Sequence, residues 1–157
     1  SPDFLRHYNK NFQPDTPPSW MILECLPLGC CSSVYKNLTY FRDRNEIALI
    51  FKQPPAILDS WFESIRYTRN ICAHHSRLWN HWFVIEPKHP KSLKHIKTKE
   101  RSFHQQAIML HLLNKALSPK SLWQDKLKDL FETYAKDVPF EKMGFNKVWK
   151  KDVFWTL

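Results

Sequence analysis

The chain has 157 residues, of which 43% are hydrophobic and 15% aromatic, enough apolar material for one compact domain and too much for a disordered chain. It contains only two glycines, Gly29 and Gly144, which excludes the glycine-rich phosphate loops of ATPases, kinases and dinucleotide-binding folds. Lysine and arginine number 24 against 15 aspartates and glutamates, so the formal charge of +9 makes nucleic acid the expected partner. The scarcity of glycine and the excess of leucine over valine favour an all-α fold.

Proline interrupts the first 18 residues at positions 2, 14, 17 and 18, so residues 1–18 are predicted to form an extended arm. Residues 19–157 are predicted to form the helical domain, and its first helix is expected to begin at about Ser19, a residue type that caps helix N-termini. Three of the four cysteines cluster in the segment 25–31, a spacing that fits no disulfide framework. With no signal peptide ahead of them, they indicate a reducing cytoplasm.

Apolar residues recur at helical spacing in several further segments. Helices are expected over 20–40 with a break at Pro27 and Gly29, and over 45–51, 102–117 and 119–136. No apolar run approaches the roughly 20 residues that cross a bilayer, so no membrane partner is expected. Residues 86–101 combine two prolines with a basic set that includes Lys91, Lys94 and Lys97, and are predicted to form an exposed loop that could contact RNA phosphates. The aromatic tail 138–157 is expected to pack back on the bundle.

The strongest periodicity predicts one long helix over residues 56–83. Its core-facing stripe repeats every seven residues, at Leu58, Ile65, Cys72 and Trp79. Polar residues step by three or four along another side of the same helix and form a ridge: Glu63, Arg66, Asn70, His74, Arg77 and His81. Trp79 and Trp82 are expected to be core residues rather than platforms for base stacking.

Three residue types in this helix suit the cleavage of a phosphodiester. Arg69 can bind phosphate and stabilise the charge that develops on its oxygens. His74 offers an imidazole, the side chain best suited to exchange a proton with a ribose hydroxyl, while Asn70, four residues before it, lies on the same helical face. His75 could replace His74, and Arg66, Arg77 and His81 are candidate RNA contacts. The sequence thus predicts metal-free RNA cleavage, with no cofactor and no metal.

The spacing also predicts a dimer. Arg69 and His74 are five residues apart, which places them roughly 140° apart around a helix, so they cannot reach one atom from a single copy. A second copy across a two-fold axis would complete the site. Three alternatives stay open: a solvated helix face without function, a non-catalytic module that binds RNA or an antitoxin, and a zinc site from Cys72, His75 and another cysteine.

The segment Arg69–Asn80 resembles the signature of the Abi-like proteins of abortive infection and phage resistance, which belong to the HEPN superfamily of helical ribonucleases. The motif in that superfamily is Arg, commonly Asn, three variable residues and His, which Arg69, Asn70 and His74 fit without a gap. Two other stretches are similar to the family: Pro17 to Trp20 with Glu24, Gly29 and Ser32, and Met143 to Phe145 with Trp149 and Trp155. Only about sixteen residues precede Pro17, so the chain resembles the C-terminal portion of a longer protein.

The resemblance implies a bacterial, cytoplasmic, HEPN-like helical bundle. It implies a homodimer whose composite cleft cleaves RNA, with Arg69 and His74 as catalytic residues and Asn70 orienting them. It further implies products with a 2′,3′-cyclic phosphate and a 5′-hydroxyl, and an antitoxin or RNA regulator as a further partner. An inert fragment of a larger defence protein is the remaining alternative.

Overall fold

A computed structural model describes residues 3–13 and 16–156. Within these ranges the chain is helical and contains no β-strand, which confirms the all-α prediction. Its helices are α1 (Asp3–Asn11), α2 (Ser19–Cys25), α3 (Leu28–Lys36), α4 (Phe41–Ile50), α5 (Pro55–Ala73), α6 (Phe103–Leu117), α7 (Trp123–Thr133) and α8 (Val153–Thr156). Short 3₁₀ turns lie at Lys91–Leu93, Phe140–Met143 and Trp149–Lys151.

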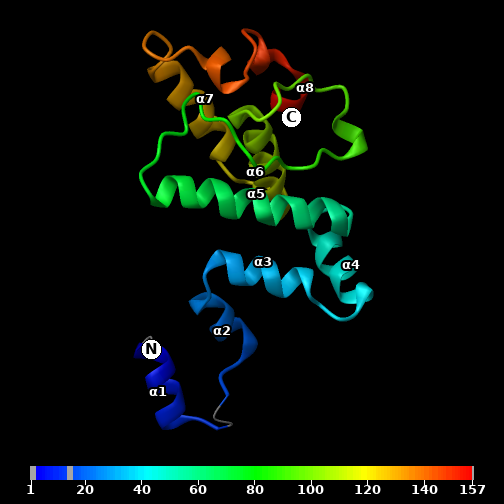
Figure 1. Cartoon of the computed structure of the whole chain (residues 1–157), viewed down its shortest axis with the longest axis vertical. Helices are drawn as coiled ribbons and strands as arrows, with labels where there is room; N and C mark the ends of the chain where they lie inside the picture. Colours follow the sequence, from blue (N-terminus) through cyan, green and yellow to red (C-terminus); the bar gives the residue numbers. More distant parts are fainter. Residues whose placement is uncertain (1–2, 14–15, 157) are drawn as a thin grey trace.

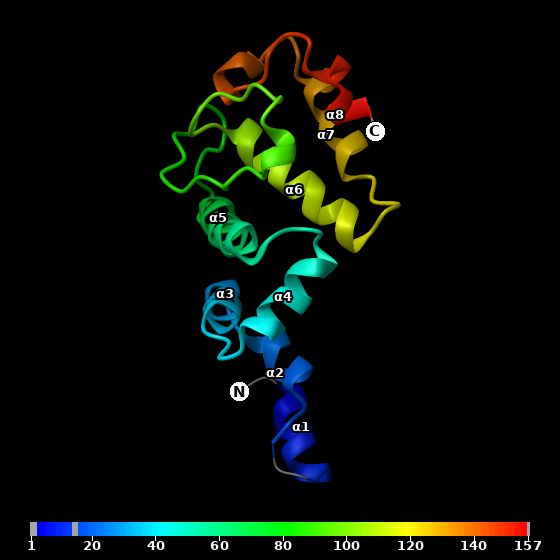
Figure 2. The ribbon, with the colours of Figure 1, turned by 90° about the vertical axis from the view of Figure 1, so that its right-hand side faces the viewer.

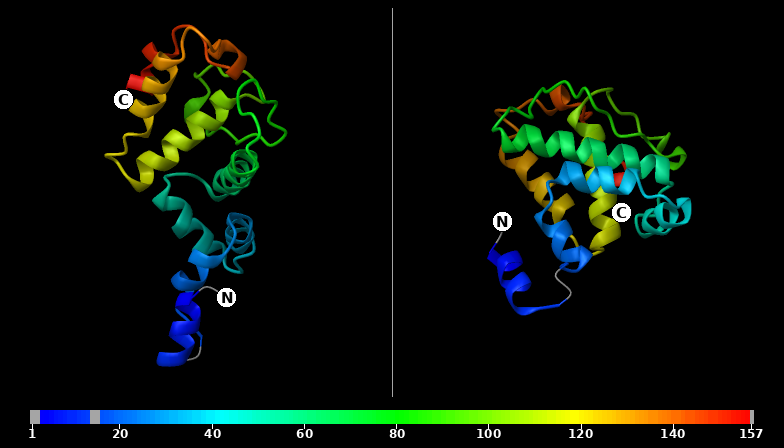
Figure 3. Two further views of the ribbon diagram at one scale, coloured as in Figure 1. Left: turned by 90° about the vertical axis from the view of Figure 1, so that its left-hand side faces the viewer. Right: turned by 60° about the horizontal axis from the view of Figure 1, so that its bottom comes forward.

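Helix α5 crosses the middle of the molecule and separates two layers (Figure 1). Helices α6 and α7 and the C-terminal segment lie on one side of it, and α3 lies alongside it on the other. Helices α1 and α2 extend away from this body, so that the two ends of the chain lie at opposite ends of the molecule (Figure 2). The same separation is visible from the opposite side (Figure 3). No helix in the part of the chain that the structure describes is both long and apolar enough to span a membrane.

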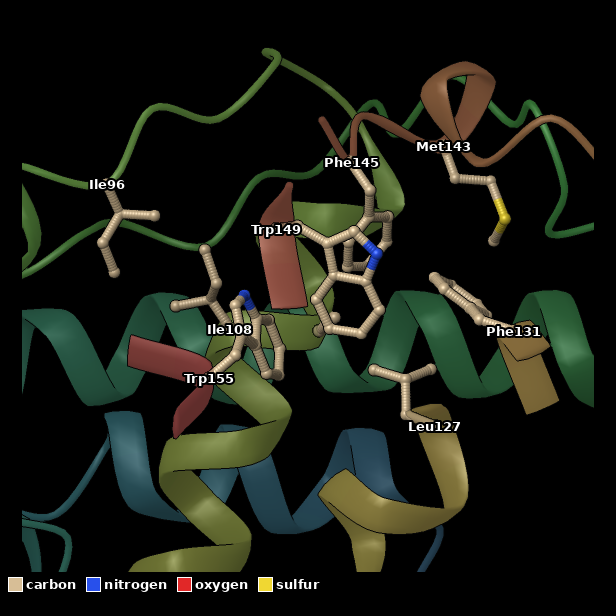
Figure 4. Close-up of a cluster of buried hydrophobic side chains, with 9 residues drawn as sticks. Ile96, Ile108, Leu127, Phe131, Met143, Phe145, Trp149 and Trp155 are labelled. Carbon is tan, nitrogen blue, oxygen red and sulfur yellow. The ribbon is translucent and has the colours of Figure 1, made fainter. Parts of the chain in front are cut away.

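The larger hydrophobic cluster lies between α6, α7 and the C-terminal segment (Figure 4). Phe131 of α7 stacks on Phe140 with ring centroids 4.1 Å apart, and its edge meets Phe145 at 4.9 Å. Trp155 is fully buried in the same cluster. The tail therefore packs back on the bundle, as the sequence predicts, and its aromatic surface supplies much of the apolar area removed from water.

A second cluster joins α3, α4 and α5 to α6. The ring of Tyr35, from α3, meets Phe62 of α5 edge to face at 5.1 Å. Gly29 allows the close approach, because a Cβ at this position would lie 3.1 Å from Cδ of Arg66. An ion pair between Arg44 and Asp59 ties α4 to α5. These contacts fix α3 beside the N-terminal half and the middle of α5.

Several predicted boundaries need correction. The prediction of an extended arm over 1–18 is wrong for Asp3–Asn11, which form α1. Residues 1–2 and 14–15, which include two of the four prolines, lie outside the described residues. Ser19 is the first residue of α2 rather than its cap. The predicted break between α2 and α3 is confirmed, whereas α7 begins at Trp123 and not at Pro119. Its N-cap is Leu122, because Ser118–Ser121 close a turn of their own.

The segment 86–101 is a loop, as predicted, although Ile96 anchors it in the larger cluster. Trp82 contradicts its predicted core position, because its side chain is 61% exposed and lies under the guanidinium of Arg101 at 5.5 Å. Trp79 is half-buried and packs against the larger cluster.

Replacing Gly144 by alanine is expected to lower the free energy of unfolding by at least about 2 kcal/mol. Gly144 has a φ of 90°, which an L residue adopts only under strain, and an added Cβ would lie 2.2 Å from Oγ of Ser102. Urea denaturation followed by circular dichroism measures the effect. Gly29→Ala is the matched control, since its Cβ meets only the flexible side chain of Arg66, and an equal loss in both variants would contradict the argument.

Candidate active site at the end of helix α5

Helix α5 ends at Ala73, ten residues before the predicted end at Phe83. The chain leaves the helix through a Schellman turn, in which the N–H of Ser76 donates to the carbonyl of Ile71 at 2.9 Å and the N–H of His75 to that of Cys72 at 3.0 Å. His75 takes the left-handed position of this turn with a φ of 51°, where glycine is usual. The prediction of one unbroken helix over 56–83 is therefore wrong.

The turn also changes the predicted stripe and ridge. Leu58 is fully buried and Ile65 half-buried, but Cys72 is exposed at the end of the helix. The buried positions of α5 are Leu58, Trp61, Ser64, Thr68 and Ile71. The continuous ridge ends at Asn70, because the later members leave the helix.

The three motif residues lie at this end of α5. Arg69, in the last turns of the helix, is exposed and donates from its guanidinium to Oδ1 of Asn70 at 3.2 Å. His74 is the C-cap residue, also exposed, and its backbone N–H donates to the carbonyl of Asn70 at 3.0 Å. In the described chain, no hydrogen bond or ion pair joins the side chains of Arg69 and His74. Both groups therefore face solvent and are available to a ligand.

The arginines of the chain divide into two groups. Arg6, Arg42, Arg44 and Arg101 each form an ion pair with an aspartate or glutamate. Arg66, Arg69 and Arg77 have no carboxylate partner among the described residues. Arg77 instead lies over the ring of Trp79 at 5.7 Å. All the guanidinium groups that lack a carboxylate thus belong to the segment around the motif, which is suited to an anionic ligand.

The fold does not bring all the other predicted RNA-contacting residues to the end of α5. His81 is half-buried, shares a hydrogen bond of 3.2 Å with the hydroxyl of Tyr67, and packs on buried Phe83. The basic loop 86–101 lies elsewhere, because the backbone of its residue Lys88 bonds to Ser60 and Trp61 in the N-terminal half of α5. In Figure 1 this green loop extends beyond the end of α5 opposite to the motif. The exposed side chains of Lys91, Lys94 and Lys97 therefore lie apart from Arg69 and His74.

No metal site accompanies the motif in the described part of the chain, where no group of three or more His, Cys, Asp or Glu could hold an ion. All four cysteines are free thiols. A polar groove of about 710 Å³ lies between α3 and α5, and its residue nearest the motif in the sequence is Arg66, one helical turn before Asn70. Sequence reasoning missed this groove, because only the fold brings residues of α3 opposite those of α5; the close approach at Gly29 is its one local signal.

Replacing His75 by glycine is expected to raise the free energy of unfolding by about 0.5 kcal/mol, because glycine adopts the positive φ without strain but loses more backbone entropy. His75→Val is the matched control and is expected to lower it by about 1 kcal/mol, since a β-branched residue fits this conformation worst. Urea denaturation tests both. A stability of His75→Gly below that of the wild type would contradict the argument.

Comparison with known proteins gives one match. The family model of the Abi-like proteins matches residues 1–80, which contain α1 to α5, the Schellman turn and every motif residue. The C-terminal resemblance around Met143 lies outside this match. No match to a curated protein or to a solved structure was found. The chain, matched over more than half of its length, belongs to the Abi-like family.

Proposed function

We propose that the protein is a metal-independent endoribonuclease of phage defence that works as a homodimer. Membership of the Abi-like family supports the role in phage defence. One observation supports the nuclease activity. Arg66, Arg69 and Arg77 lack a carboxylate partner among the described residues, whereas the other arginines have one. Uncompensated guanidinium groups around an exposed histidine are the groups that RNA cleavage without a metal requires.

The reaction needs one proton removed and one proton delivered. His74 accepts the proton of a ribose 2′-hydroxyl, and the 2′-oxygen attacks the adjacent phosphorus while the bond to the 5′-oxygen breaks. An imidazolium, either the same group or the one from the second copy, returns a proton to the departing 5′-oxygen. The products are a 2′,3′-cyclic phosphate and a 5′-hydroxyl. DNA, which has no 2′-hydroxyl, is spared.

Arg69 and Asn70 support this chemistry. The guanidinium of Arg69 binds the non-bridging phosphate oxygens, whose negative charge grows in the transition state. Asn70 accepts a hydrogen bond from Arg69, which limits the directions in which the guanidinium points. Arg69 and His74 do not meet within one copy, so the partner's copy of the motif completes the site. His75 and Arg77 are auxiliary groups.

Purified protein incubated with labelled single-stranded RNA in EDTA is expected to release fragments that end in a cyclic phosphate. The double variant Arg69→Ala/His74→Ala is expected to be slower by at least about a thousandfold, since both electrostatic stabilisation and proton transfer are lost. Arg6→Ala/His7→Ala is the matched control, because it removes the same two residue types from exposed positions on α1. Equal cleavage by the wild type and the motif variant would refute the proposal.

A non-catalytic role in binding RNA or an antitoxin is the second candidate, favoured by the single copy, in which the guanidinium of Arg69 bonds to Asn70 and not to His74. In that case RNA stays intact with every variant, and its affinity falls steeply with salt as phosphate contacts are lost. Light scattering adds a further test, since a strict monomer at micromolar concentration could not form a composite site and would be inert alone.

A further inference from the structure

The groove between α3 and α5 runs along α5 from Ala56 to Arg66, and none of the motif residues lines it. One face of each helix lines it, together with two residues of the following loop: Gly29, Ser32, Ser33, Lys36, Ala56, Asp59, Ser60, Glu63, Arg66, Glu86 and Lys88. Its volume of about 710 Å³ lies within the range of small-molecule sites. Arg66 forms its end nearest the motif, one helical turn before Asn70. A chain of nucleotides with its cleaved bond at the motif would therefore continue into this groove.

The carboxylates of the groove are not equivalent. Asp59 forms an ion pair with Arg44. Glu86 accepts a hydrogen bond of 2.7 Å from the backbone N–H of Arg101 and lies 3.8 Å from its guanidinium. Glu63 is exposed and has no ion pair or side-chain hydrogen bond to any described residue. One acceptor group in the groove is thus left for a ligand.

The positively charged side chains of the groove also form no ion pair with a described residue. The side chains of Lys36, Arg66 and Lys88 have no carboxylate partner in the described ranges. The groove therefore offers one carboxylate, Glu63, beside three positive charges and the hydroxyls of Ser32 and Ser33. The ligand that complements this set is an anion that also presents hydrogen-bond donors, which describes a nucleotide.

We propose that this groove binds the nucleotide next to the cleaved bond, and that Glu63 selects guanine there. This inference rests on the proposed function. Guanine presents two adjacent donors, N1–H and the N2 amine, which a carboxylate accepts together. Adenine and cytosine present one amine beside an acceptor nitrogen that repels a carboxylate, and the N3–H of uracil lies between two carbonyls. The cations hold the phosphates on either side of the base.

Binding is measured in the Arg69→Ala/His74→Ala background, so that the RNA stays intact. Fluorescence anisotropy compares single-stranded oligonucleotides that carry guanine, inosine, adenine or uracil at one position in an otherwise uniform sequence. Guanine is expected to bind about tenfold more tightly than adenine, and inosine, which lacks the N2 amine, is expected to fall between them. Inosine requires no change in the protein, so this comparison does not depend on how a variant folds.

The variant Glu63→Gln is expected to bring the guanine and adenine oligonucleotides within about twofold of each other, because a neutral amide cannot accept both donors. Glu141→Gln, an exposed carboxylate outside the groove, is the matched control and is expected to keep the tenfold preference. Equal binding of all four oligonucleotides, or an undiminished preference in Glu63→Gln, would overturn the inference. If the wild type did not cleave RNA but preferred guanine through Glu63, the proposed nuclease activity would be refuted and the guanine site would stand. Cleavage without base preference would refute this inference alone.

Discussion

An equimolar mixture of the Arg69→Ala and His74→Ala variants, each inactive alone, is expected to recover about a quarter of the wild-type rate of RNA cleavage after subunit exchange. In a composite site the guanidinium comes from one copy and the imidazole from the other. A mixed dimer therefore has one site that lacks both groups and one that retains both. Half of the dimers in a random mixture are mixed, and half of their sites are intact.

The mixture separates the composite site from a site within one copy. If both groups acted from the same chain, every chain in the mixture would lack one of them and the activity would stay lost. Arg69→Ala mixed with Arg69→Ala/His74→Ala is the control, because no pairing in it restores the guanidinium. Exchange is monitored by mass spectrometry of differently labelled copies, so that an inactive mixture with complete exchange refutes the composite site.

The sequence predicts the helices best where local rules agree. The break at Pro27 is confirmed, because proline has no backbone N–H to continue a helix, and α6 (Phe103–Leu117) begins within one residue of the predicted 102–117. The end of α5 is different. The spacing of Leu58, Ile65, Cys72 and Trp79 continues past it, and no glycine or proline marks the turn. His75 adopts the left-handed conformation that glycine would signal.

A second turn of the same kind closes α4, where Lys52 has a φ of 53° and the N–H of Gln53 donates to the carbonyl of Ala48 at 3.1 Å. A chain with two glycines thus ends two helices with ordinary residues in the left-handed conformation, which composition alone cannot indicate. At both places the hydrogen bonds of the turn accompany the strained conformation, and both residues are exposed. The motif residues could be identified by their spacing, but their exposure and the ion pairs of Arg44 and Arg101 depend on contacts between residues far apart in the sequence.

Acidification is expected to destabilise the protein well above the pKa range of ordinary carboxylates. The side chain of His104 on α6 is 2% exposed, with its ring 4.4 Å from that of Phe145. Burial lowers the pKa of His104 from 6.5 to about 4. Burial also lowers the pKa values of His89 and His111. These side chains are therefore held neutral in the folded state at a pH where the unfolded chain is protonated.

The sign follows from proton uptake. Between about pH 6.5 and pH 4 the unfolded chain binds a proton at His104 that the folded chain does not, so the free energy of unfolding falls as the pH is lowered. For His104 alone the loss from about pH 7.5 to pH 4.5 is about 2.5 kcal/mol, and His89 and His111 add to it. Urea denaturation at several pH values in this window measures the slope.

Two variants test whether His104 causes the pH dependence of the free energy of unfolding. His104→Met replaces the imidazole by a flexible apolar side chain and is expected to remove most of the 2.5 kcal/mol or so attributed to His104, whatever its effect on stability at neutral pH. His95→Gln is the matched control, because His95 is exposed on the loop, and it is expected to leave the slope unchanged. A slope of undiminished size in His104→Met would place the acid sensitivity elsewhere. Since His104 packs against the C-terminal aromatic segment, a slope reduced to the share of His89 and His111 would assign most of the acid sensitivity to this buried layer and not to the exposed motif.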